Sequence, residues 1–216
     1  MSHLLESYKT LLNPGNHEID IKGSRFICHL QRVTTEEEAL GIIQAVKKEH
    51  WKANHNCYAY VIGEQDQVQR ASDDGEPSGT AGVPILEVLK KNQVHNVLAI
   101  VTRYFGGTKL GAGGLIRAYT QATATALSHL GIAECSLEQI VELTIQYTDM
   151  GKLDNYLAQE AITVLDRVFS DQVVFLCSIP ISQVDTFQEN VIDLLNNRLS
   201  IRLTDTHIVE RPWQGD

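Results

Sequence analysis

The chain has 216 residues, a mass of 24.1 kDa, an apolar share of 43% and a formal net charge of −9. This length suits one large domain or two small ones, and no stretch approaches the roughly 18 consecutive apolar residues that a membrane span needs. The composition therefore indicates a soluble globular protein. Its acidic balance excludes a basic coat for nucleic acid over the whole surface.

The N-terminal sequence and the cysteines both favour a cytoplasmic protein. The first residues, MSHLLESYKTLLN, have neither the basic start nor the small-residue cleavage site of a secretory signal. Cys28, Cys57, Cys135 and Cys177 lie far apart, and no C-x-x-C pair suggests a zinc site or a redox dithiol. We therefore expect four reduced, partly buried thiols.

Residues 1–134 are predicted to form a mixed α+β domain. Alternating or β-branched segments predict strands over residues 17–33, 57–63, 68–74 and 96–105. Apolar residues at helical spacing predict helices over residues 34–50, 83–92 and 113–130. Thr35 is the expected N-cap of the first helix, and Gly131 ends the last one.

Residues 135–216 are predicted to form a second, acidic domain. Strand patterns at 138–148, 162–170, 172–180 and 201–210 and helix patterns at 150–161 and 182–200 give the order βαββαβ, which is the ferredoxin-like unit. Small and polar residues at 130–138 indicate the junction between the domains. Residues 136–216 contain 13 acidic and 5 basic residues, against 14 and 13 in residues 1–135.

A glycine-rich segment, RYFGGTKLGAGGLIRAY, joins the buried strand at 96–105 to the helix at 113–130. Glycines let the backbone approach a ligand, and the exposed amides of a helix N-terminus together with cations are a recurrent way to bind an anion. The candidate anion- or nucleic-acid-binding residues of this segment are Arg103, Gly106, Gly107, Lys109, Gly111, Gly113, Gly114 and Arg117.

The surrounding charges also favour an anion. The 46 residues from Val88 to Ala133 contain no Asp or Glu, where the average composition predicts about six. Arg117 is expected in the first, exposed helical turn, where a cation opposes the helix dipole by up to about 1 kcal/mol. The glycines would equally suit a tight strand-to-helix turn without a ligand. The spacing matches neither the P-loop nor the dinucleotide-binding fingerprint.

An acidic segment, SDDGEPSGTAGVP, has three alternative interpretations. Asp73, Asp74 and Glu76 could hold Mg²⁺ through water beside a phosphate, because hard cations prefer oxygen ligands. They could instead be turn residues that bind nearby amides. In the third interpretation, Asp73 or Glu76 pairs with Arg103 or Arg117 and braces it. We assign no metal ligand set.

A basic and aromatic run, KKEHWKANHNCYAY (47–60), has a composition that suits nucleic acid. Cations near a helix C-terminus are also expected because of the helix dipole. His55 is the residue of this run that joins the candidate binding set. The alternative is a hydrogen-bonded structural histidine.

Four segments resemble the signature blocks of the IMPACT family, in the two-domain form of bacterial YigZ-like proteins. They are KGSRFICHL (22–30), HNCYAYVIG (55–63), RASDDGEPSGTAGVPIL (70–86) and VTRYFGGTKLGAGGLIRAY (101–119). Arg25, in the first block, completes the candidate binding set. The resemblance implies a ribosomal-protein-type β-α fold for the first domain, as in a domain of elongation factor G. It also implies a ferredoxin-like second domain, similar to another domain of that factor.

The resemblance also bears on function. Eukaryotic members regulate translation by binding an activator of an initiation-factor kinase, through an additional N-terminal domain. This chain begins close to the shared blocks, so we expect that role not to carry over.

We predict a non-catalytic binding or regulatory protein that is associated with translation or RNA and contacts phosphate groups through its first domain. The expected partners are the ribosome, structured RNA or a protein of the translation machinery, with no membrane and no recognition of a DNA sequence. The alternative is a metal-assisted enzyme acting on a phosphorylated small molecule or nucleotide, with Mg²⁺ as its cofactor. A third hypothesis makes both loops structural and places the function in protein contacts elsewhere.

Overall fold

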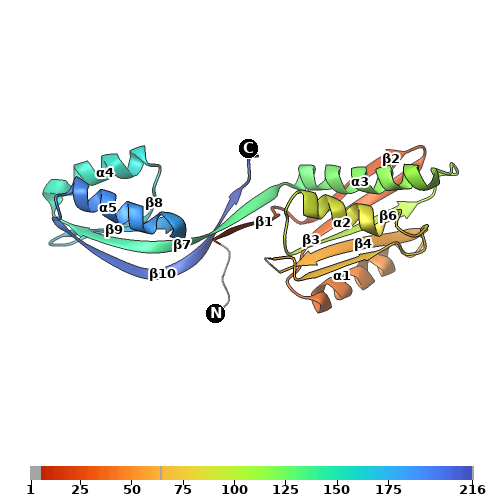
Figure 1. Cartoon of the computed structure of the whole chain (residues 1–216), viewed down its shortest axis with the longest axis horizontal. Coiled ribbons are helices and arrows are strands. Elements are labelled where there is room, and N and C mark those ends of the chain that lie inside the picture. Colours follow the sequence, from red (N-terminus) through yellow and green to blue (C-terminus); the bar gives the residue numbers. More distant parts are fainter. Residues whose placement is uncertain (1–5, 64, 216) are drawn as a thin grey trace. The chain divides into compact units, whose positions relative to one another are not determined.

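The computed structural model describes residues 6–63 and 65–215 and divides the chain into two compact α+β units (Figure 1). The N-terminal unit comprises residues 8–134 together with 211–215. The C-terminal unit comprises residues 135–210 together with Glu6 and Ser7. Residues 6–7 therefore belong to the unit built mainly from the second part of the sequence, and residues 211–215 belong to the unit built mainly from the first part. The predicted division into residues 1–134 and 135–216 lacks this exchange.

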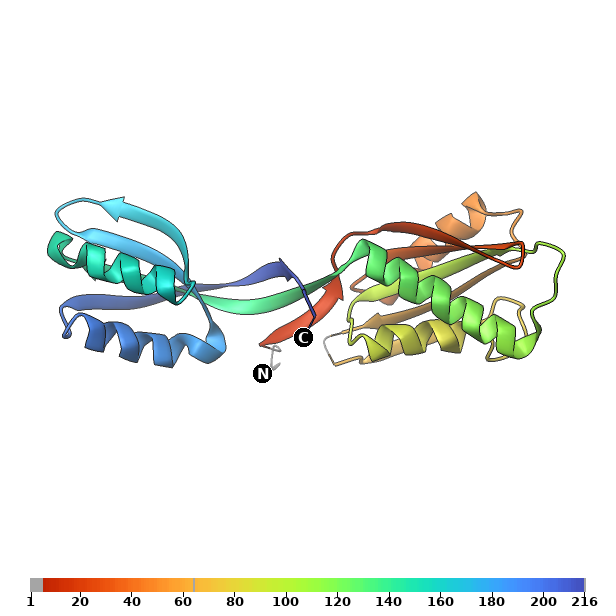
Figure 2. The same cartoon turned by 90° about the horizontal axis from the view of Figure 1, so that it is seen from above.

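The N-terminal unit is built on one antiparallel sheet with helices on both faces. Its strands stand in the order β2-β3-β6-β4-β5. Their bounds are Gly15–Ile21 (β2), Ser24–Arg32 (β3), Val97–Tyr104 (β6), His55–Ile62 (β4) and Val68–Ser72 (β5). Helices α2 (Gly82–Lys91) and α3 (Gly111–Leu130) cover one face, and α1 (Glu36–Glu49) covers the other (Figure 1, Figure 2).

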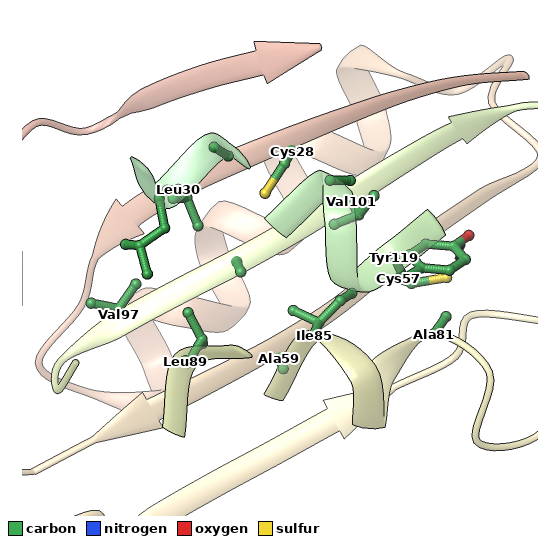
Figure 3. Close-up of a cluster of buried hydrophobic side chains, with 14 of the residues drawn as sticks. Cys28, Leu30, Cys57, Ala59, Ala81, Ile85, Leu89, Val97, Val101 and Tyr119 are labelled. Atoms are coloured by element: carbon green, nitrogen blue, oxygen red, sulfur yellow. Dashed lines mark hydrogen bonds between the residues drawn. The ribbon is translucent and has the colours of Figure 1, made fainter. Parts of the chain in front are cut away.

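The central strand β6 is buried on both faces, as its unbroken apolar sequence predicts. Val97, Ala99 and Val101 join the core under α2 and α3, and the residues between them, Leu98 and Ile100, join the core under α1. Figure 3 shows the first of these cores, in which residues of β3, β4 and β6 lie under residues of α2 and α3.

The predicted N-cap of α1 and the predicted end of α3 are confirmed, whereas the predicted position of Arg117 in the first turn of α3 is wrong. The Thr35 side chain accepts a hydrogen bond from the Glu38 amide at 3.2 Å, and Gly131 ends α3 with a φ of 82°. However, α3 begins at Gly111, so Arg117 lies in its second turn and opposes the helix dipole much less than expected. Ile116 is 42% exposed, and Leu115 is buried.

The C-terminal unit has the predicted element order βαββαβ. Its elements are β7 (Ile132–Ile145), α4 (Met150–Gln159), β8 (Thr163–Phe169), β9 (Val173–Pro180), α5 (Val184–Leu194) and β10 (Leu199–Pro212), with short 3₁₀ turns η1 (Tyr147–Asp149) and η2 (Ile181–Gln183) before the helices. The sheet order is β1-β7-β9-β8, and β10 also pairs with β7. Both helices pack on one face (Figure 1).

Three features of this region differ from the sequence predictions. Most of the expected junction at 130–138 is the first half of β7, which begins at Ile132, with Ala133 and Cys135 buried. Strand β1 (Ser7–Leu11), which pairs with β7, was not predicted. The last helix ends at Leu194 rather than near residue 200, because Asn196 and Asn197 have positive φ angles of 50° and 58°.

The four cysteines are buried more completely than expected, and burial raises the pKa of the Cys57 thiol to about 12. In the part of the chain that the structure describes, no helix combines the length and the apolar character that a membrane crossing requires.

Candidate anion-binding site

A pocket of about 350 Å³ lies at the N-terminus of α3. Its wall is formed by Asn54, His55, Glu76, Pro77, Arg103, Phe105, Lys109, Leu110, Gly111, Ala112 and Leu115. The antiparallel pairing of β4 with β6 sets His55 directly opposite Arg103, and the loop between β5 and α2 contributes Glu76. Three of the four sequence blocks described above thus meet at one pocket.

A buried ion pair forms the base of this pocket. The Arg103 Nη1 atom lies 2.6 Å from Oε1 of Glu76, and their side chains are 7% and 3% exposed. The Tyr119 hydroxyl donates a hydrogen bond of 2.8 Å to the same carboxylate oxygen, and the Phe26 ring lies under the guanidinium, 5.4 Å from its Cζ. The bracing interpretation is therefore confirmed for Glu76 and Arg103, and this pair neutralises the Arg103 guanidinium.

Both members of the ion pair keep unused hydrogen-bonding atoms. Among the described residues, the Arg103 guanidinium has a partner only at Nη1, and its buried Nε has none. The second carboxylate oxygen of Glu76, Oε2, accepts no hydrogen bond from the described residues and lies 3.8 Å from Nε2 of His55. Nε of Arg103 is a buried polar atom without a partner among the described residues, which is rare in folded proteins, and Oε2 of Glu76 remains free to accept a hydrogen bond from a ligand.

His55 is held in one orientation by the backbone. Its Nδ1 lies 2.9 Å from the carbonyl oxygen of Asp74. A carbonyl can only accept, so Nδ1 carries the proton. In the neutral ring Nε2 is therefore a hydrogen-bond acceptor, and it becomes a donor when the ring is protonated. The side chain is 24% exposed, which leaves Nε2 accessible at the pocket.

The start of α3 gives the pocket a positive charge. Leu110, the N-cap residue, supplies no side-chain cap, and the first turn contains no acidic residue. Lys109 is exposed and forms no ion pair within the described residues. Because the charges of Glu76 and Arg103 cancel, Lys109 and the free amides of α3 determine the net charge of the site.

Asp73 organises the acidic loop from outside the pocket. Its Oδ2 accepts a hydrogen bond from the Gly79 amide at 2.8 Å, and its Oδ1 accepts from Ala81 at 3.0 Å and Gly82 at 2.8 Å. Burial alone would raise the pKa of Asp73, but the three amide hydrogen bonds outweigh it and hold the pKa below its ordinary value. This carboxylate acts as the cap of α2.

Replacing Asp73 with asparagine is expected to lower the free energy of unfolding by about 1 to 2 kcal/mol at pH 7, because an amide has one acceptor oxygen for three donors. The pKa of Asp73 is depressed in the folded state, so its contribution is complete above the unfolded pKa of about 3.9 and is lost as the pH falls through the folded value. Urea unfolding at pH 7 and in acid should show the difference shrinking. A difference independent of pH, or an equal loss in the exposed control Asp20→Asn, would contradict this role.

The other acidic residues do not join Asp73 in one ligand set. Asp74 pairs with Lys47, at 2.5 Å from Oδ1, and its Oδ2 accepts from the Asn56 amide at 2.6 Å. Within residues 6–63 and 65–215, no group of three His, Cys, Asp or Glu residues has a geometry that fits a metal ion. The segment therefore braces the pocket through separate contacts.

The glycines of the predicted loop have different roles. Gly106 packs against the turn before β3, where an added Cβ would lie 1.8 Å from the carbonyl oxygen of Gly23. Gly111 has a φ of 70° and lies in the pocket wall. Gly107, Gly113 and Gly114 are outside the pocket wall. The structural interpretation therefore holds for Gly106, and only Gly111 is placed to contact a ligand.

Two predicted cations are not in the pocket wall, and one aromatic residue was missed. Arg25 forms a bidentate pair with Glu18, with both N–O distances at 2.8 Å, and Arg117 is exposed one turn further along α3. Phe105, 45% exposed at the rim, and Asn54 were not among the candidates. An exposed aromatic inside a glycine-rich cationic segment was the available signal for Phe105.

Comparison with known proteins identifies the two units. A family model described as the Impact N-terminal domain matches residues 22–127, and a domain of unknown function, DUF1949, matches residues 143–198. The chain is 48% identical over 208 residues to the IMPACT family member YvyE of Bacillus subtilis (strain 168), and the match covers 96% of each chain.

Two further matches extend over nearly the whole chain. The IMPACT family member YigZ of Escherichia coli (strain K12) is 33% identical over 199 residues, covering 91% of this chain and 98% of YigZ. A crystal structure described as that of an hypothetical protein superposes with a TM-score of 0.59 at 31% identity, covering 94% of this chain and 99% of the other. The protein therefore belongs to the IMPACT family, in the two-domain branch that includes YigZ.

Proposed function

We propose that this IMPACT family protein is a non-catalytic binding protein associated with translation, which holds a phosphate group of RNA at the start of α3. The observation that carries the proposal is the pocket itself. It joins the uncapped amides at the start of α3, the exposed Lys109 and the partly unused guanidinium of Arg103.

The local chemistry suits a phosphate oxygen in particular. Backbone amides at a helix N-terminus point along the helix axis and carry partial positive charge, so they bind an anion without moving. Lys109 adds a full charge, and the neutralised Glu76 does not oppose it. The stretch of 46 residues without an acid includes β6 and α3, so no nearby carboxylate of these elements competes for the site.

We further propose that the N-terminal unit has the ribosomal-protein-type β-α fold found in elongation factor G and that the C-terminal unit is ferredoxin-like. The order βαββαβ, with β7 between β9 and β10 in the sheet, supports the second assignment. The acidic residues of the C-terminal unit would keep the chain from binding RNA indiscriminately, through like-charge repulsion. We expect ribosomes or structured RNA in the cytoplasm to be the partner.

Titration with ribosomes and with structured RNA at two salt concentrations tests this function. The chain should bind less tightly at the higher salt, because phosphate contacts release counterions. Lys109→Met should weaken binding and reduce the dependence of log K on log salt by about 1. The matched control is Arg117→Met, which removes an exposed cation in the second turn of α3 outside the pocket wall and should have a smaller effect. Binding that ignored salt, or that was equally sensitive to both variants, would contradict the proposal.

A further inference from the structure

We infer that the pocket takes a single nucleotide unit with a terminal phosphate, either a free nucleoside monophosphate or the end of an RNA chain. The inference rests on the proposed function, because it uses the same phosphate site at the start of α3. It adds the sugar and the base to the ligand, and it excludes the internal phosphates of a duplex. Four properties of the pocket support it.

The first property is size. A volume of about 350 Å³ lies in the range of small-molecule pockets, which begins at about 300 Å³. It is enough for one nucleotide but not for a helix or for several stacked nucleotides. We therefore assign the phosphate inside this pocket to a free nucleotide or to the last unit of a chain.

The second property is the number of donors at the anionic end. The start of α3 at Gly111 and Ala112, the Lys109 ammonium and the guanidinium of Arg103 all belong to the wall. The Arg103 side chain is more than nine-tenths buried, and its Nε–H has no partner among the described residues. A terminal phosphate has three free oxygens and a charge of about −1.5 to −2, so it uses these donors better than an internal phosphate does.

The third property is the presence of acceptors beside these donors. Oε2 of Glu76, in a side chain that is 3% exposed, accepts no hydrogen bond from the described residues. Nε2 of His55, 3.8 Å away, is also an acceptor when the ring is neutral, because Nδ1 then carries the proton. Inorganic phosphate at neutral pH offers few protons to such atoms. The hydroxyl groups of a ribose are donors and would satisfy them.

The fourth property is an apolar side with an exposed aromatic ring. Pro77, Leu110 and Leu115 line the pocket, and Phe105 stands at its rim with 45% of its surface exposed. The Arg103 Cζ atom lies 5.6 Å from the Phe105 ring centroid, so the guanidinium group holds the ring in place through a cation–π contact. Bases stack on such aromatic side chains without regard to sequence, and a phosphate alone would leave this part of the pocket empty.

Calorimetric titration of the full chain with six probes tests the inference. The probes are inorganic phosphate, ribose 5-phosphate, adenosine, adenosine 5′-monophosphate, and the dinucleotide ApA with and without a 5′-phosphate. Adenosine 5′-monophosphate should bind at least about 10-fold more tightly than inorganic phosphate and than adenosine, because it fills both ends of the pocket. ApA should gain affinity when it carries the terminal phosphate.

Two variants separate the ends of the ligand. Phe105→Ala should weaken the nucleotide about 10-fold and leave inorganic phosphate unchanged, whereas Lys109→Met should weaken both. The control is Trp51→Ala, which removes another exposed aromatic residue, 72% exposed and outside the pocket wall, and should change neither affinity.

The outcomes distinguish a failure of the inference from a failure of the proposed function. Equal affinity for inorganic phosphate and the nucleotide, with no effect of Phe105→Ala, overturns the inference but leaves the phosphate site intact. If no phosphorylated probe binds and ribosomes and RNA do not bind either, the proposed function fails as well. Tighter binding of the phosphorylated dinucleotide than of the mononucleotide identifies an RNA end as the source of the ligand. The reverse order identifies the free nucleotide, and both orders support the inference.

Discussion

Replacing Gly106 with alanine is expected to destabilise the N-terminal unit by about 3 kcal/mol or more. An added Cβ would lie 1.8 Å from the carbonyl oxygen of Gly23, 2.0 Å from its carbon and 2.6 Å from the amide nitrogen of Ser24. All three are backbone atoms, so no side chain can rotate away, and β3 or the glycine loop must move. Urea unfolding of the variant measures the loss.

A second glycine of the glycine-rich segment provides the matched control for Gly106. Gly113 lies inside α3, and a Cβ there would meet only the Nη1 atom of Arg117, at 3.9 Å. Gly113→Ala should leave stability unchanged or raise it by up to about 1 kcal/mol, because alanine is the better helix former. Equal effects of the two substitutions would show that the close approach of Gly106 to Gly23 does not limit stability.

Removing one partner of the buried ion pair should have an effect of similar size. Arg103→Met is expected to lower the free energy of unfolding by about 3 to 5 kcal/mol at pH 7, because it leaves the Glu76 carboxylate buried without its counter-charge. The double variant Glu76→Gln with Arg103→Met should recover much of this loss. A double-mutant cycle measured by urea unfolding gives the coupling between the two side chains.

An exposed pair in the same unit shows what a weak ion pair would look like. The side chains of Arg25 and Glu18 are 51% and 41% exposed. Breaking this ion pair should lower the free energy of unfolding by no more than about 1 kcal/mol. A loss in Arg103→Met as small as that in Arg25→Met would contradict the structural role of the buried pair. Arg103→Met is therefore expected to disturb folding as well as binding, so Lys109→Met is the cleaner test of the phosphate site.

Hydrophobic periodicity predicted most of the helices and strands, because their apolar faces are buried against a sheet or a helix. It did not predict β1, whose five residues become a strand only through pairing with β7. The sequence pattern also predicted a junction at 130–138, because small residues such as Ala133 are typical of loops. In the structure Ala133 is buried in strand β7. Both misses depend on partners that are remote in sequence.

The sequence located the candidate site but not the state of its residues. The glycine-rich segment, the acidic segment and His55 were expected separately, and the pairing of β4 with β6 brings them together. Residue type alone could not show that Arg103 is buried, because its partner Glu76 lies 27 residues earlier in the chain. Nor could it separate Gly106, required by close packing, from Gly111, which lies in the pocket wall.

The most direct test of the central claim is an NMR titration of the ¹⁵N-labelled chain with inorganic phosphate. The account predicts that the backbone amide signals of Gly111 and Ala112 shift most, that they saturate together, and that Lys109→Met reduces the affinity measured from them. Absence of any saturable shift at these two amides, or equal shifts at amides distributed over the surface, would show that the start of α3 does not hold a phosphate group.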